Sequence, residues 1–185
     1  MTRIKPIDPN IAEGETKEVL ALAQKQFGGI PNAFKTLASS HVVLEAFLGM
    51  SSPLARGSLT PALREQIALA VAGKNNCDYC ASAHTAIGEM AGLSTKEMAL
   101  NLKGKSQEST TQCILEFVNH ILESRGQVYD IEFIKLKELK LTDAEISEIV
   151  AHTAMNIFTT YYHMIAKTEI DYPLVKAQNK QFDDY

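Results

Sequence analysis

Apolar residues recur at the spacing of an α-helix along almost the whole chain, and no segment shows the alternation of a β-strand. The run EQIALAVAG is apolar on most sides, which indicates a buried helix, and one-sided stripes run through residues 16–27, 43–48, 107–124 and 146–165. A chain of 185 residues is about one domain in length and can bury a substantial core. We therefore expect one all-α domain of about seven to nine helices.

Several helix starts are marked by residues that satisfy free backbone groups. Thr60 and Pro61 form a cap followed by proline in the first helical position. The segments 94–97 and 142–145 each have a Ser or Thr followed three residues later by Glu, the pattern of a capping box. Ser40 is a candidate cap for the helix that follows it.

The most informative segment holds a carboxylate, two cysteines and a histidine. Asn76 is a favourable N-cap, so we expect a helix that begins near Cys77. At about 100° per residue, Cys77, Cys80 and His84 fall within a wedge of about 60° on one face of that helix. Glu65 lies in the preceding helix, and a hairpin of the two helices would turn Glu65 towards His84.

This arrangement favours thiol chemistry. The free N–H groups and the dipole of a helix start stabilise a thiolate, and cysteine pKa values fall from ~8.5 to ~3.5–7.5 in such places. An imidazole one turn away can accept the thiol proton, and a carboxylate can orient the imidazole. A second cysteine close by can trap a sulfenic acid as a disulfide.

The spacing from Glu65 through Cys77-Asp78-Tyr79-Cys80 to His84 resembles the core of the AhpD-like alkylhydroperoxidases, in the carboxymuconolactone decarboxylase superfamily. Eleven residues separate the Glu from the first Cys, and three separate the second Cys from the His. The resemblance extends from the GGIPNAF segment to residues 92–94, and more weakly to residues 168–173. It is strongest with the branch of longer proteins described as peroxidase-related.

The resemblance implies an all-helical AhpD-like fold and a peroxiredoxin activity that reduces hydrogen peroxide or organic hydroperoxides. It implies that Cys80 attacks the O–O bond, that Cys77 resolves the sulfenic acid, and that His84 and Glu65 relay protons. A dithiol would act as the reductant, on a lipoyl-carrying protein or a thioredoxin-like protein. Tyr79, where the family can have His, is also a candidate site residue; it can donate a hydrogen bond but is a poor base near pH 7.

Three other interpretations stay open. With Tyr79 beside Cys80, the pair could belong to a thiol–disulfide oxidoreductase or redox sensor with weak peroxidase activity. The two cysteines and His84 could instead bind zinc in a helical scaffold, although a structural zinc site needs a fourth ligand. A decarboxylase-type lyase is the least favoured, because the decarboxylases of the superfamily typically lack the cysteine pair.

The remaining cysteine and histidines are given structural roles. Cys113 lies on an apolar stripe and is expected to be a buried small hydrophobic residue. His152 and His163 lie ~16 Å apart along one helix, too far to share a metal, and are assigned to packing or a subunit contact. The same helix has more apolar surface than one stripe requires, which predicts a homo-oligomer, a trimer or hexamer by resemblance; this surface includes Phe158, Tyr161, Tyr162 and Met164.

Composition and charge disfavour several other classes of function. A net charge of −4 offers no basic face for nucleic acid and no attraction to an anionic membrane. There is no apolar run of ~20 residues, and the first residues lack the apolar core of a secretory signal. With three cysteines and no such signal, we expect a cytoplasmic protein. No flavin, haem or nucleotide motif is present, and neither a cofactor nor a metal is expected.

We treat residues 1–185 as a single AhpD-like domain in three parts. The redox core is expected at about residues 40–102, because the cysteine motif and the buried helix both fall there. A C-terminal helical part follows at residues 107–172, and residues 178–185 are expected to form a polar tail.

Overall fold

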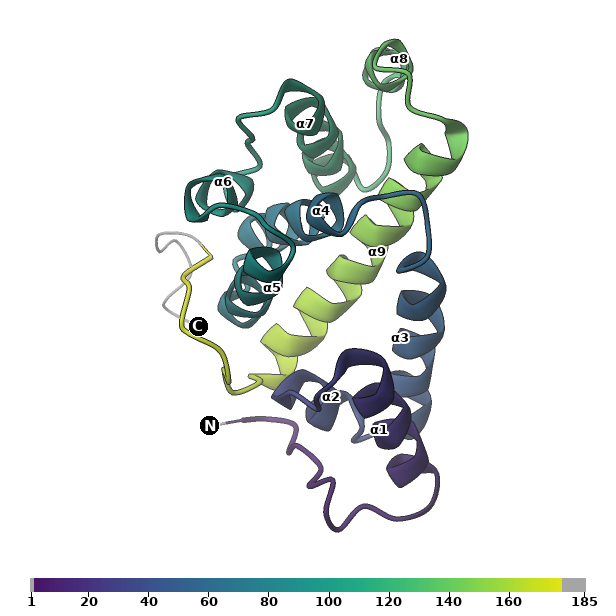
Figure 1. Cartoon of the computed structure of the whole chain (residues 1–185), viewed down its shortest axis with the longest axis vertical. Coiled ribbons are helices and arrows are strands. Elements are labelled where there is room, and N and C mark those ends of the chain that lie inside the picture. The colour runs from purple at the N-terminus through teal and green to yellow at the C-terminus, as the bar shows by residue number, and fades with distance from the viewer. Residues whose placement is uncertain (1, 178–185) are drawn as a thin grey trace.

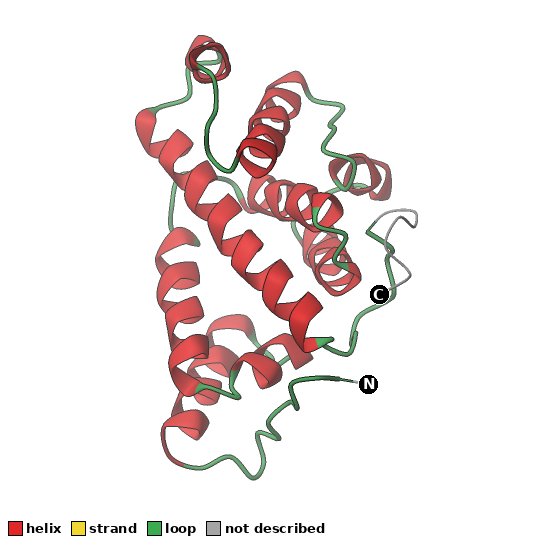
Figure 2. Cartoon of the chain, turned by 180° about the vertical axis from the view of Figure 1, so that it is seen from behind, coloured by secondary structure: helices red, strands yellow, loops and turns green. Residues whose placement is uncertain are grey.

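The computed structural model describes residues 2–177, and over that range the chain forms nine α-helices and no β-strand (Figure 1, Figure 2). The helices are α1 (Gly14–Phe27), α2 (Asn32–Leu37), α3 (His41–Leu54), α4 (Pro61–Lys74), α5 (Asp78–Met90), α6 (Thr95–Asn101), α7 (Ser109–Ser124), α8 (Asp130–Glu138) and α9 (Asp143–Ala166). The expected all-α fold is confirmed. The tail expected at residues 178–185 lies outside the described residues. No helix within residues 2–177 is long and apolar enough to cross a membrane.

Helix α4 lies at the centre of the molecule and packs against α5, α6, α7 and α9 (Figure 1). All residues from Gln66 to Gly73 are buried, which confirms the buried helix predicted by the run EQIALAVAG. Gly73 lets α4 approach the end of α6 closely, because a Cβ atom at this position would collide with the carbonyl oxygen of Leu102.

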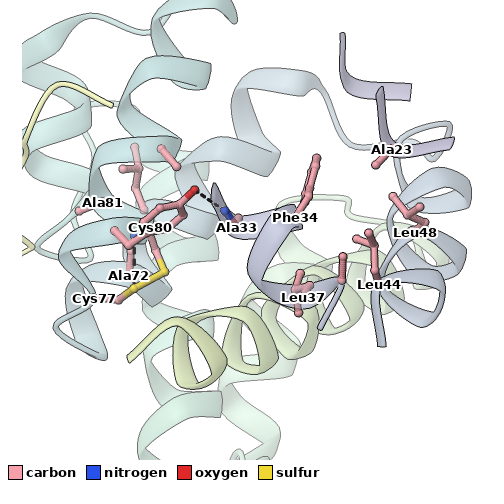
Figure 3. Packing of buried hydrophobic residues seen from close by; sticks show 14 of the residues in the cluster. Ala23, Ala33, Phe34, Leu37, Leu44, Leu48, Ala72, Cys77, Cys80 and Ala81 are labelled. Atoms are coloured by element: carbon pink, nitrogen blue, oxygen red, sulfur yellow. Dashed lines mark hydrogen bonds between the residues drawn. A yellow bond between two sulfur atoms is a disulfide. The ribbon is translucent and has the colours of Figure 1, made fainter. Parts of the chain in front are cut away.

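Two apolar clusters fill the interior. The first joins α1, α2 and α3 to the start of α5, and Figure 3 shows part of it, including Leu37, Leu44, Cys77 and Cys80. The second packs α4 against α7, α8 and α9, and includes Ile67, Leu115, Leu136 and Ile149. The cysteine motif therefore lies where the N-terminal helices meet α5.

Most of the expected helix starts are found. Thr60 Oγ1 accepts a hydrogen bond from Leu63 N at 3.1 Å at the start of α4. Thr142 and Glu145 form a complete capping box at the start of α9. Ser40 occupies the N-cap position of α3, but its side chain makes no capping hydrogen bond. Helix α8 coincides with none of the apolar stripes named above, and its single buried residue, Leu136, packs in the second cluster.

The capping box expected at Ser94 and Glu97 is only half formed. Ser94 Oγ accepts from Glu97 N at 3.2 Å, but the Glu97 carboxylate turns into the protein instead of back towards Ser94. There it accepts hydrogen bonds from Gln66 of α4, from Asn101 of α6 and from residues 106–107. The carboxylate turns inward because these buried donors require an acceptor.

Glu97 thus ties α4 and α6 to the loop before α7, and we predict that this tie stabilises the fold. Burial raises the pKa of Glu97, but hydrogen bonds from Ser106, Asn101 and Gln107 outweigh burial and hold the pKa at about 2. A Glu97→Gln variant should lose about 2–3 kcal/mol of unfolding free energy at neutral pH, because the amide nitrogen cannot accept these bonds.

The pH dependence has a defined sign. The pKa of Glu97 in the folded protein lies below its ordinary value of 4.5. The contribution of Glu97 to the unfolding free energy is therefore present above pH 4.5 and is lost as the pH falls towards about 2. Denaturant titrations at neutral pH and in this acid window measure both effects. Glu89→Gln, at an exposed carboxylate of α5, is the matched control. The same acid dependence in wild type and Glu97→Gln would contradict the account.

Candidate active site

The turn between α4 and α5 sets the position of both cysteines. Asn76 has a left-handed φ of 56°, a conformation in which asparagine is enriched. Cys77 is the N-cap of α5, and its Sγ accepts a hydrogen bond from Cys80 N at 3.2 Å. The expectation that Asn76 caps this helix is therefore wrong by one residue. Asn76 supplies the left-handed turn, so the extended cap position falls on Cys77.

Cys77 and Cys80 are joined by a disulfide, and both residues are almost fully buried (Figure 3). The two cysteines have different surroundings. Both belong to the first apolar cluster, but Cys80 also lines a cavity of about 700 Å³, and Cys77 does not. Of the two, Cys80 is therefore the one that a molecule in the cavity can meet.

The α4–α5 hairpin brings Glu65 against His84. His84 Nδ1 lies 2.7 Å from Glu65 Oε2, and both side chains are mostly buried and line the cavity. A carboxylate can only accept a hydrogen bond, so the proton of this bond belongs to His84 Nδ1. Nε2 of the neutral ring is then the nitrogen with a free lone pair. His84 follows Cys80 by four residues on α5, one turn further along the same face.

Tyr79 also lines the cavity, but its hydroxyl group is occupied by protein partners. The oxygen accepts from Ala33 N at 2.9 Å and donates to Asp171 Oδ1 at 3.0 Å. Asp171 Oδ2 in turn accepts from Asn32 N at 2.7 Å. Burial, reinforced by the negative charge of Asp171, raises the pKa of Tyr79 far above its ordinary value. The phenol therefore stays protonated and ties α2 and α5 to the segment after α9.

That segment, residues 168–177, runs along α5 and holds its first turns (Figure 1). Val175 N donates to Ser82 Oγ at 2.9 Å, and Ala177 N donates to Asp78 Oδ1 at 2.9 Å. Lys176 Nζ forms an ion pair with Asp78 at 2.6 Å. These bonds join the C-terminal part of the described chain to residues on both sides of Cys80.

The wall of the cavity is mainly apolar. Its residues come from α1 to α5, from α9 and from the segment after α9, and its apolar members include Phe27, Phe34, Phe47, Ile87, Met90 and Met155. Its volume falls in the range of ~300–1,000 Å³ that is typical of sites for small molecules. The cavity therefore combines an apolar wall with Cys80 and the Glu65–His84 pair.

Sequence reasoning missed two residues of this wall, His152 and His163, which it had assigned to packing or a subunit contact. Both are buried on α9 and line the cavity. Burial, with the nearby His84, lowers the pKa of His163 to about 3, and its Nδ1 lies 3.1 Å from Thr168 Oγ1. Burial, with the charge of Arg64, also lowers the pKa of His152. A signal was present in the sequence, because polar residues share this buried face: Thr153, Asn156 and Thr160.

Cys113 stands apart from the site. It is a free, partly buried thiol against the second apolar cluster, and burial raises its pKa. Its packing agrees with the expected hydrophobic role, although it is less buried than expected. Within residues 2–177, no group of three or more His, Cys, Asp and Glu side chains is arranged to hold a metal ion.

Part of the chain that holds these residues matches a known family. Residues 42–104 match the carboxymuconolactone decarboxylase family, and this span contains Glu65, both cysteines of the disulfide and His84. Alkyl hydroperoxide reductase Rv2159c of Mycobacterium tuberculosis (strain ATCC 25618 / H37Rv) is 30% identical over 101 residues. The aligned region is 54% of this chain and 29% of that relative, so this chain spans less than a third of the relative's length.

Solved structures share the fold. An AhpD-core, peroxidase-related protein from Ralstonia eutropha JMP134 superposes with a TM-score of 0.81 at 23% identity, over 92% of both chains. A peroxidase-related protein from Silicibacter sp. TM1040 gives a TM-score of 0.75 at 21% identity, over 90% of this chain and 91% of that one. The debrominase Bmp8 in complex with 2,3,4-tribromopyrrole gives 0.74 at 17% identity, over 92% of both chains. The resemblance to this family and the AhpD-like fold are therefore confirmed.

We predict that Tyr79 acts as a structural tie. A Tyr79→Phe variant leaves the amide of Ala33 and the carboxylate of Asp171 without their shared partner, and should lose about 1–3 kcal/mol of unfolding free energy. Denaturant titration measures the loss. Tyr129→Phe is the matched control, because Tyr129 is 76% exposed at the start of α8. Equal stabilities of the two variants would show that the hydroxyl of Tyr79 adds nothing to the fold.

Proposed function

We propose that this chain, whose residues 42–104 match the carboxymuconolactone decarboxylase family, is a thiol-dependent peroxidase that reduces hydroperoxides. One observation carries the proposal: Cys80 and the Glu65–His84 pair line the same cavity, while Cys77 lies outside its wall and is already bonded to Cys80. A nucleophile, a base and an orienting carboxylate are thus present where a substrate can reach them. The alkyl hydroperoxide reductase among the relatives supports the same chemistry.

The first step consumes the peroxide. His84 Nε2 accepts the Cys80 thiol proton while the Glu65 carboxylate holds the proton on Nδ1. The Cys80 thiolate attacks one peroxide oxygen, so that an S–O bond forms and the O–O bond breaks. His84 returns the proton to the departing alkoxide. The balance is one thiol and one hydroperoxide in, and one sulfenic acid and one alcohol out.

The second step restores a disulfide. The Cys77 thiol attacks the sulfur of the Cys80 sulfenic acid, an S–S bond forms, and water leaves with the oxygen. The disulfide between the two residues supports this step, because it is the bond that the step forms. The position of Cys77 at the helix N-cap, beside free backbone N–H groups, favours its thiolate once the disulfide is reduced.

A dithiol must then reduce the pair to complete the cycle. A lipoyl-carrying protein or a thioredoxin-like protein supplies two thiols, which become a disulfide as Cys77 and Cys80 become thiols again. The reductant attacks Cys77, which is not part of the cavity wall and is only 2% exposed, so this attack requires the surrounding chain to open. We place this cycle in the cytoplasm, where glutathione and thioredoxin systems keep thiols reduced.

A thiol–disulfide oxidoreductase with weak peroxidase activity is the second candidate. The observation in its favour is Tyr79, which stands where the family can have His. Its pKa is raised and its hydroxyl group is bound to the protein, so Tyr79 adds no second base beside His84 for the peroxide step. The rates with a hydroperoxide and with a model disulfide separate the two functions. A disulfide reduced faster than any hydroperoxide would favour the second.

The cysteines are predicted to have unequal roles. Cys80→Ser should abolish dithiol-dependent peroxide consumption, because the attacking sulfur is lost. Cys77→Ser should stop after one turnover with a sulfenic acid on Cys80, which a dimedone-type probe and mass spectrometry detect. Cys113→Ser is the control and should keep wild-type turnover. Turnover that survives in Cys80→Ser would contradict the proposal.

We also predict a homo-oligomer, a trimer or hexamer, held partly by α9. Phe158, Tyr161 and Ile165 follow one another at helical spacing and are 41%, 54% and 62% exposed in the single chain. Burying this stripe between chains is favourable by about 25 cal/mol per Å². Light scattering at micromolar concentration should give a multiple of 20.4 kDa.

A matched pair of charge substitutions tests the interface. Ile165→Glu should lower the mass towards that of one chain. Ile131→Glu, at a 57% exposed position on α8, should leave the mass unchanged. A monomeric wild type would remove this prediction.

A further inference from the structure

The cavity is far larger than the smallest peroxide requires. Hydrogen peroxide has two heavy atoms and occupies little more space than a water molecule, whose share of liquid volume is about 30 Å³. The cavity of about 700 Å³ could hold a drug-sized organic molecule beside Cys80. A small polar peroxide would leave most of the apolar wall without contacts, so the volume points to a larger substrate.

Three phenylalanines form one continuous part of the wall. Phe27 of α1, Phe34 of α2 and Phe47 of α3 have ring centroids 4.8 to 6.3 Å apart, and all three line the cavity with Cys80. Figure 3 shows Phe34 in the same cluster as the two cysteines, although α2 and α5 are distant in sequence. We call Phe27, Phe34 and Phe47 the aromatic wall. It offers ring faces and edges for an apolar or aromatic group.

The polar groups around the cavity mostly bond to the protein. Glu65 holds His84, Tyr79 bonds to Ala33 and Asp171, and His163 lies beside Thr168. His152 Nε2 is the exception, because among the described residues it is buried without a hydrogen-bond partner. The wall therefore offers few unused polar groups to a polar ligand. An apolar molecule needs none, so it could enter without breaking these bonds.

The charges of the wall disfavour an anion. Glu65 and Asp171 bring two carboxylates, and Arg64 is the one Lys or Arg side chain in the part of the wall that lies within residues 2–177. Arg64 Nη1 already donates to the carbonyl oxygens of Ala55 and Leu59, at 2.8 and 3.3 Å. His152 and His163 add no positive charge at neutral pH, because their pKa values are lowered. His84 also lines the cavity, and in the proposed mechanism its ring is neutral before it accepts the Cys80 proton. A ligand with its own carboxylate would then meet net negative charge.

From volume, wall and charge together, we infer that the cavity selects bulky, uncharged organic hydroperoxides over hydrogen peroxide and over anionic hydroperoxides, with the aromatic wall as the specificity determinant. This inference rests on the proposed peroxidase function. The chemistry at Cys80 is unchanged: the substrate leaves as the alcohol that corresponds to the hydroperoxide.

Phe27→Ala tests the wall with the least risk to folding, because Phe27 is 46% exposed. With cumene hydroperoxide and hydrogen peroxide as paired substrates, the ratio of their kcat/KM values should be well above one in the wild type. Phe27→Ala should lower that ratio by about tenfold, as the loss of an apolar contact does in other pockets. Phe133→Ala, at a 39% exposed phenylalanine of α8, is the control and should keep the wild-type ratio.

A second pair of substrates tests the charge. Linoleic acid hydroperoxide and its methyl ester have the same chain and differ in one negative charge. The ester should have the higher kcat/KM. Equal values for acid and ester, or the same ratio of cumene hydroperoxide to hydrogen peroxide in wild type and Phe27→Ala, would overturn the inference while peroxide turnover itself stood.

A binding measurement separates this inference from the proposed function. Cumyl alcohol, the unreactive product, should bind the oxidised protein in calorimetry, and Phe27→Ala should weaken the binding by about tenfold. Binding without any peroxide turnover would refute the peroxidase and retain the assignment of the cavity. If cumyl alcohol did not bind and Phe27→Ala dissociated an oligomer, a second copy of the chain would cover the aromatic wall. That result would overturn the inference.

Discussion

The packing of α4 against α5 is the constraint on which the rest of the site depends. Helix α4 is buried along most of its length, so its position is fixed by α6, α7 and α9 at once. The left-handed turn at Asn76 then sends α5 back along α4 and sets Glu65 opposite His84, 2.7 Å away. If the hairpin shifted by one residue, the carboxylate would miss the imidazole, and Cys80 would lose its place in the cavity wall.

The two cysteines are bonded to each other and share the first apolar cluster, yet of the two only Cys80 lines the cavity. Cys80 lines the cavity with the Glu65–His84 pair, and Cys77 lies at the helix N-cap in the apolar cluster. The segment after α9 binds residues on both sides of Cys80 through Asp78, Tyr79 and Ser82. These bonds link the cysteine turn to chain that is distant in sequence.

The sequence predicted the structural features that depend on residues close together in the chain. The helices, the buried character of α4, the caps at Thr60 and Thr142, and the helix-to-helix approach of Glu65 and His84 all follow from spacing within one or two helices. The cap at Cys77 was misplaced by one residue, because asparagine suits both the cap and the left-handed turn before it.

What depends on distant segments could not be read from one sequence. Glu97 faces inward because Gln66, which is 31 residues away, needs an acceptor. His152 and His163 were assigned to packing or a subunit contact, because the sequence does not show that α9 runs along the cavity. The bond from Tyr79 to Asp171 spans 92 residues, and the aromatic wall joins three helices that carry no shared motif. These features arise from packing between helices, which no local pattern encodes.

The most direct test of the central claim is a count of thiols after a single turnover. The fully reduced protein is mixed with one equivalent of cumene hydroperoxide, the free thiols are alkylated, and the peptides are mapped by mass spectrometry. The account predicts that each peroxide removes two thiols, that Cys77 and Cys80 are recovered as a disulfide, and that Cys113 is still alkylated. Unchanged thiols at Cys77 and Cys80, or a loss confined to Cys113, would contradict it.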